Sequence, residues 1–65
     1  MSEEYKRFVR EFRRVTFGLD VFDMAEDLGV SAHTIYNWFS LKSSMNAECM
    51  LKIIKLYKIN LGVIA

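Results

Sequence analysis

VFDMAEDLGVSAHTIYNWFS, residues 21–40, is the most informative stretch of this 65-residue chain. Asp20 and Ser31 are typical N-caps, because their side-chain oxygens can accept hydrogen bonds from the free backbone N–H groups at a helix start. Apolar residues recur after each cap at spacings of three and four, which is the pattern of a buried helical stripe. The stretch therefore predicts two short helices, over residues 21–28 and 32–39.

Only a three-residue turn, Gly29–Ser31, separates these two expected helices. Helices that cross steeply over such a turn need a small residue where they touch, a turn residue that tolerates positive φ, and an apolar anchor in the second helix. Ala25, Gly29 and Ile35 meet these three needs. We therefore expect the two helices to pack closely against each other.

This arrangement resembles the helix-turn-helix of the Cro and lambda-type repressor family (XRE type), which has alanine, glycine and a branched aliphatic residue at the same relative positions. Leu28 and Val30 fit the neighbouring apolar positions, and the similarity extends into a capped helix after Asn46, so that it covers about residues 5–60. The resemblance implies an all-α, lambda-repressor-like bundle of four to five helices. The competing interpretation is an ordinary helical bundle in which the three residues coincide.

Two longer helices are expected on either side of the motif. Ser2, followed by two glutamates, is a helix-start signature, and the apolar stripe after it predicts a helix over residues 3–16. Asn46 can cap a further helix expected over residues 46–57. Residues 59–65 are apolar and rich in β-branched side chains, a composition that suits either a short helix or an edge strand. The alternatives stay open at this point.

Composition and charge limit the kinds of function that the chain can have. Nine Lys and Arg against eight Asp and Glu give a net charge of +1, so the balance indicates neither a polybasic nor an acidic protein. A single cysteine, Cys49, and a single histidine, His33, exclude an internal disulfide and a thiolate zinc cluster. The sequence also lacks glycine-rich phosphate loops and paired catalytic groups. We expect one domain, residues 1–65, with no metal, no cofactor and no enzymatic activity.

The distribution of charge also bears on location. The first twenty residues are charged throughout and contain no apolar signal-peptide core, so a cytoplasmic protein is expected. Three lysines interrupt the most apolar stretch, Leu51–Ala65, which is therefore not expected to span a membrane.

The family resemblance implies that residues 31–40 form a recognition helix that enters the major groove of DNA. By position in the motif, four residues fall where the family reads bases: Ala32, His33, Tyr36 and Asn37. Asparagine can pair with adenine, histidine can donate to guanine, and an alanine methyl can meet a thymine methyl. Ser31 and Thr34 fall where the family caps the helix or touches phosphate.

Basic and hydroxyl side chains near the recognition helix are candidates for phosphate contacts. On a helical wheel, five basic residues of the first helix share about one third of its circumference: Lys6, Arg7, Arg10, Arg13 and Arg14. The expected phosphate contacts are Arg14, Ser31, Thr34, Lys42, Ser43 and Ser44. Such contacts supply most of the sequence-independent affinity for DNA.

Some residues depart from the family pattern. Val21 stands where the family often has a glutamine that contacts a phosphate, and four acidic residues crowd the helix over 21–28 and its cap, so that helix must turn its acidic side away from DNA. Trp38-Phe39 is similar to the pair in the homeodomain recognition helix, but Leu41 replaces the adenine-reading asparagine of that family. We interpret both aromatic residues as core.

The sequence-based hypothesis is a sequence-specific DNA-binding transcriptional regulator of the Cro or repressor type, of a size common in phages and mobile elements. It is expected to bind a near-palindromic double-stranded operator as a homodimer. The expected dimer interface is the segment from Leu56 to Ala65, with Ile59, Leu61, Val63 and Ile64 as its apolar residues and the outer face of the preceding helix as support.

Two alternatives accompany this hypothesis. The C-terminal segment can instead fold back on the first helix and complete the core of a monomer. The whole scaffold can instead be a protein-interaction module, such as an antirepressor, an antitoxin or an adaptor.

Overall fold

The computed structural model describes residues 2–59, which form four α-helices: α1 (Glu3–Val15), α2 (Val21–Leu28), α3 (Ala32–Phe39) and α4 (Ala47–Tyr57). The prediction of an all-α bundle is confirmed, and the described residues contain no strand. The expected helices at 3–16 and 46–57 are each one residue too long, because Thr16 and Asn46 are caps. Residues 60–65, where helix and strand were left open, lie outside the described residues.

All four helices start at the caps that the sequence predicts. In each case the side-chain oxygen of the cap accepts a hydrogen bond from a backbone N–H in the first turn. The donors are Tyr5 N to Ser2 at 3.1 Å, Phe22 N to Asp20 at 2.8 Å, Thr34 N to Ser31 at 3.1 Å, and Cys49 N to Asn46 at 2.8 Å. These bonds satisfy donors that have no partner inside the helix, and so they set where each helix begins.

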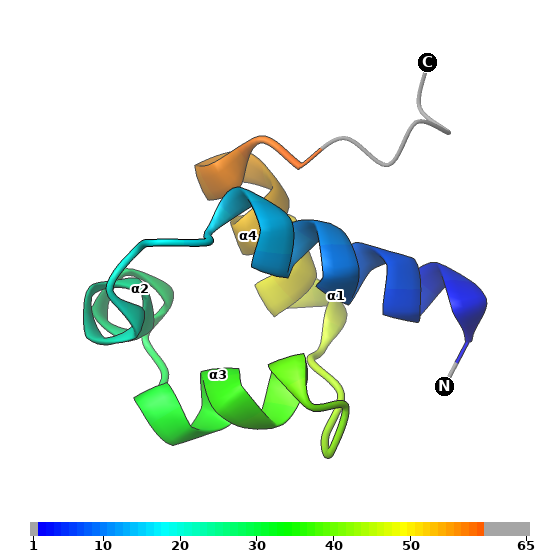
Figure 1. Cartoon of the computed structure of the whole chain (residues 1–65), viewed down its shortest axis with the longest axis horizontal. Coiled ribbons are helices and arrows are strands. Elements are labelled where there is room, and N and C mark those ends of the chain that lie inside the picture. Colours follow the sequence, from blue (N-terminus) through cyan, green and yellow to red (C-terminus); the bar gives the residue numbers. More distant parts are fainter. Residues whose placement is uncertain (1, 60–65) are drawn as a thin grey trace.

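The turn between α2 and α3 is stabilised as the sequence predicts. Gly29 has φ +72°, the left-handed conformation that glycine adopts without a steric penalty, and it ends α2. The N–H of Val30 then donates to the carbonyl of Ala25 at 3.0 Å. α3 starts at once, and in Figure 1 α2 is viewed end-on whereas α3 lies in the plane of the page, so the two helices cross steeply.

The core lies where the four helices meet. Its completely buried large side chains are Phe8, Phe12, Ile35 and Ile53. The ring of Phe12 lies 5.1 Å from that of Phe39 and 5.8 Å from that of Tyr57, measured between centroids, so one aromatic cluster joins α1, α3 and α4. Trp38 is buried, as expected, whereas Phe39 is only half-buried.

One hydrogen bond connects α1 to the segment between α3 and α4. The N–H of Met45 donates to the phenolic oxygen of Tyr5 at 3.1 Å, across forty positions of sequence. Met45 is itself buried, so this bond satisfies a backbone donor that is shielded from water. The connection after α3 is therefore attached to the body of the protein.

Ile59 corrects the expectation for the C-terminal segment. It was expected in a dimer interface, but only 5% of it is exposed and it belongs to the core of the single chain. Lys58 adopts a left-handed conformation, with φ +52°, and the chain leaves α4 there. Ile59 itself therefore contributes to the monomer core, whereas the rest of the tail lies outside the described residues.

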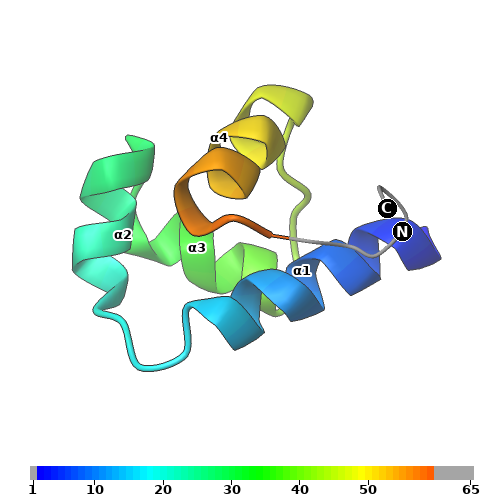
Figure 2. The ribbon, with the colours of Figure 1, turned by 90° about the horizontal axis from the view of Figure 1, so that it is seen from above.

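The helices leave one side of α3 free. α1 and α3 run along opposite sides of the molecule, α2 closes one end, and α4 packs on one side of this pair (Figures 1 and 2). Over the described residues, each helix is too short or too polar to cross a lipid bilayer.

Candidate nucleic-acid interface

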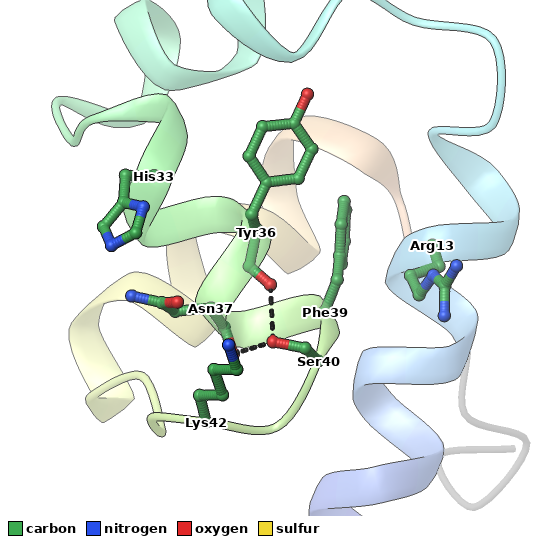
Figure 3. Close-up of a pocket in the computed structure, with 7 residues that line it drawn as sticks. All are labelled: Arg13, His33, Tyr36, Asn37, Phe39, Ser40 and Lys42. Carbon is green, nitrogen blue, oxygen red and sulfur yellow. Dashed lines mark hydrogen bonds between the residues drawn. The ribbon is translucent and has the colours of Figure 1, made fainter.

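The outward side of α3 faces an open hollow of about 470 Å³. Its lining combines side chains from α3, from the turn after it and from α1 (Figure 3): Arg13, His33, Tyr36, Asn37, Phe39, Ser40 and Lys42. The lining residues include both basic groups and neutral hydrogen-bonding groups, and none of them is a carboxylate or comes from the acidic helix α2. The hollow is therefore suited to a ligand that carries negative charge beside polar edges.

Three of the four expected base-contacting residues lie together in this hollow. His33 and Asn37 are four residues apart and share one side of α3, while Tyr36 is 55% exposed and projects beside them. Ala32, the fourth, lies outside the hollow and is half-buried against the core. The hollow thus brings together His33, Tyr36 and Asn37 but not Ala32.

Arg13 supplies a positive charge from across the hollow. Its guanidinium carbon lies 5.6 Å from the centroid of the Phe39 ring, within the range of a cation–π interaction. Because Phe39 in turn packs on Phe12, the arginine is supported by a side chain anchored in the core. Sequence reasoning placed Arg13 on a basic face and Phe39 in the core, but it did not bring the two together.

Lys42 adds a second positive charge at the end of α3. The N–H of Lys42 donates to the carbonyl of Asn37 at 2.9 Å, and Leu41 just before it adopts φ +62°. Ser40 closes the last turn, since its hydroxyl donates to the carbonyl of Tyr36 at 2.9 Å (Figure 3). These hydrogen bonds fix the turn from which the exposed lysine side chain extends.

The four hydroxyl residues among the expected phosphate contacts fall into two pairs. Ser31 acts as the cap of α3, and its hydroxyl is also within 2.9 Å of the hydroxyl of Thr34, so the capping role of this pair is the one observed. Ser43 and Ser44 are exposed in the turn after Lys42 but do not line the hollow.

Arg14 is paired with a carboxylate, whereas Arg13 lies over the Phe39 ring. It forms a two-nitrogen ion pair with Glu11, with a shortest distance of 2.8 Å, and it does not line the hollow. The hydrogen bond to Arg14 lowers the pKa of Glu11, and the same bond raises the pKa of Arg14. The spacing of three residues between Glu11 and Arg14 is the sequence signal that distinguishes the paired arginine from Arg13.

A second hollow, of about 240 Å³, continues the first along α1. The two share Arg13 and Phe39, and the second adds Lys6, Val9, Arg10 and Leu41. Basic side chains therefore follow one another from the end of α3 along α1. We call this continuous surface, with Lys6, Arg10, Arg13 and Lys42 as its basic residues, the basic track.

The structure adds little to the other candidate sites, the dimer interface and a metal site. Leu61, Val63 and Ile64 of the expected dimer interface lie outside the described residues. Within residues 2–59, no three side chains of the types that bind metals gather at one point.

No protein-family model, curated protein or solved structure is significantly similar to this chain.

Proposed function

We propose that this protein is a sequence-specific DNA-binding transcriptional regulator that inserts α3 into the major groove of double-stranded DNA. The observation that carries the proposal is the hollow on α3, which brings together three neutral hydrogen-bonding residues and two basic ones: His33, Tyr36 and Asn37 with Arg13 and Lys42. Support also comes from the close α2–turn–α3 unit and from its resemblance to the Cro and lambda-type repressor family.

The neutral residues suit the edges of base pairs. The major groove is about 12 Å wide and admits one α-helix, and each base pair presents there its own pattern of donors and acceptors. Asn37 offers an amide that can pair with adenine, and His33 offers a ring N–H for a guanine acceptor. Both lie on the outward side of α3, so neither has to leave the core to make such a contact.

The basic track suits the phosphates beside that groove. In complexes of this kind, phosphate contacts set the register of the protein and base contacts set its specificity. The arginine over Phe39 and the exposed Lys42 line the same hollow as His33, Tyr36 and Asn37, so both are candidates for contacts to the sugar–phosphate backbone. The acidic side chains of α2 stay outside the hollow, which limits repulsion of DNA there.

Operator binding by a homodimer is part of the proposal. One short helix reads only a few base pairs, so a second copy related by a two-fold axis extends the site to a near-palindrome. A bound dimer in the cytoplasm would block or recruit polymerase, as the repressor type implies.

Selection of binding sequences from a random double-stranded DNA pool tests the proposal. The wild type is expected to enrich one sequence, and Asn37→Ala is expected to enrich a more degenerate one. Glu48→Ala is the control, because it removes an exposed side chain from α4 that lies outside the hollow. Failure of the wild type to enrich any sequence at low salt would overturn the proposal.

A protein-interaction module is the second candidate. It is favoured by the exposure of large apolar side chains away from α3, since Phe17 is 91% and Phe22 is 70% exposed. If this surface is the principal site, substitution of both phenylalanines by serine abolishes function in the cell while DNA binding in vitro is unchanged.

A further inference from the structure

Charge is distributed unevenly over the helices although the whole chain is nearly neutral. Residues 16–31, which include α2, contain four carboxylates and no lysine or arginine: Asp20, Asp23, Glu26 and Asp27. Residues 46–59, which include α4, contain three lysines and one glutamate. The net charge of +1 thus conceals an acidic region at α2 and, in addition to the basic track, a basic region at α4.

The acidic region also exposes the most apolar surface. Phe17, Leu19 and Phe22 are 91%, 53% and 70% exposed. Phe22 and Glu26 are four residues apart on α2 and lie on the same side of the helix, and all the carboxylates of this region are exposed. We call the surface formed by Phe17, Leu19, Phe22 and the four carboxylates the acidic aromatic corner.

The outer face of α4 has the complementary composition. Leu51 and Leu56 are 59% and 50% exposed, and Lys52 and Lys55 lie beside them on the same helix. Lys58, at the end of α4, is exposed as well. We call this surface the basic leucine face.

Among the described residues, neither surface forms an ion pair that would neutralise its charge. Over residues 2–59, the ion pairs are Lys6–Glu3 and Arg14–Glu11, and both lie within α1. The carboxylates of α2 and the lysines of α4 therefore remain free for a second molecule, beside apolar side chains that water solvates poorly.

We propose that the acidic aromatic corner of one copy docks on the basic leucine face of a second copy. A second copy is the occupant that this chain itself specifies, because each surface supplies the charge and the apolar groups that the other needs. Such charge complementarity directs partners to each other and selects against like-charged surfaces. The inference rests on the proposed function only because both require a second copy of the chain. It assigns the contact between copies to exposed residues and not to Ile59, which is buried.

A charge-exchange experiment without DNA tests this contact. One variant carries Glu26→Lys and Asp27→Lys, at the end of α2 where positive charge suits the helix dipole. The other carries Lys52→Glu and Lys55→Glu. Each variant alone is expected to associate at least about tenfold more weakly than the wild type in sedimentation equilibrium, because like charges then meet. An equimolar mixture of the two variants is expected to associate again, because opposite charges meet in every contact between one variant and the other.

Controls separate this contact from other causes. Arg7→Glu with Arg10→Glu makes on α1 the same change in net charge as the variant with Lys52→Glu and Lys55→Glu, and it is expected to leave self-association unchanged. Phe17→Ser removes a side chain that is 91% exposed, so it is expected to weaken association without unfolding the chain, as circular dichroism would show.

Several outcomes would overturn the inference. These are a wild type that stays monomeric at every accessible concentration, charge variants that associate as the wild type does, and a mixture that remains monomeric although both variants are folded. Since all these measurements are made without DNA, the contact can fail while DNA binding stands, and the reverse.

Discussion

Replacement of Arg13 by alanine tests whether the two neighbouring arginines of α1, Arg13 and Arg14, have different roles in DNA binding. Arg13 lies over Phe39 at the edge of the α3 hollow, whereas Arg14 is paired with Glu11 outside it. If the basic track contacts phosphates, Arg13→Ala removes one such contact. Arg14→Ala removes a charge of the same type from the next position, but Arg14 is paired with Glu11 and lies outside the hollow, so no phosphate contact is expected to be lost.

The expected magnitude follows from counterion release. Each neutralised phosphate contributes about 0.9 to the slope of log affinity against log salt. Between about 50 mM and about 200 mM salt, log salt rises by about 0.6. Each phosphate contact therefore contributes a factor of about 3.5 to the loss of affinity over this range, and a variant without that contact loses about 3.5-fold less affinity. Arg13→Ala is therefore expected to bind more weakly than the wild type at low salt and to approach it at high salt.

Fluorescence anisotropy with a labelled duplex, titrated at several salt concentrations, measures this slope. Arg13→Ala and Lys42→Ala are each expected to lower its magnitude by about one unit, with base preference retained. Arg14→Ala is expected to change it by much less. Equal slopes for the wild type and Arg13→Ala, or an effect of Arg14→Ala as large as that of Arg13→Ala, would refute the assignment of Arg13 to the DNA contact.

Three further predictions concern specificity, stability and titration. Asn37→Ala and His33→Ala are each expected to relax base preference at a cost of about 1–3 kcal/mol in affinity for the selected site, and a competition assay with single-base variants of that site measures it. Ile35→Val, at a completely buried position, is expected to lower the free energy of unfolding by about 0.5–1.5 kcal/mol in urea titrations, and a loss below about 0.3 kcal/mol would contradict its anchoring role. Burial, and to a smaller extent the charge of Asp27, raise the pKa of Tyr57. The folded protein is therefore expected to lose stability as the pH rises above about 10, the pKa of an unfolded tyrosine, and Asp27→Asn is expected to lower the pKa of Tyr57 in ultraviolet titration.

The helix starts were predictable because capping is a local matter. Asp20 and Ser31 each bond to a backbone N–H within three residues, so the sequence alone contains both partners. Gly29 was predictable for the same reason, since the turn geometry that requires it involves only its neighbours. The two short helices of the motif were therefore predicted with correct bounds.

The parts that depend on packing between distant segments were not predictable in the same way. Nothing near Ile59 in sequence indicates that this residue reaches the core, and the expectation of an exposed tail was wrong there. Helical periodicity placed Arg13 and Arg14 on one broad basic face, but it does not say which of them meets α3. That choice depends on the position of Phe39, which is set by its contact with Phe12 across the core.

The bond between Tyr5 and Met45 has a consequence for the entropy of binding. Lys42 lies on a short connection whose start is bonded to α3, through the Asn37 carbonyl, and whose end is bonded to α1, through the Tyr5 hydroxyl. Ordering a free backbone costs about 1–2 kcal/mol for each residue. Because this connection is already ordered by folding, contact with a ligand restricts little more than the lysine side chain. The folding of the whole domain thus supplies the conformational cost of presenting that charge. Under the proposed function, we expect the affinity of Lys42 for phosphate to depend on the Tyr5 hydroxyl on a distant helix.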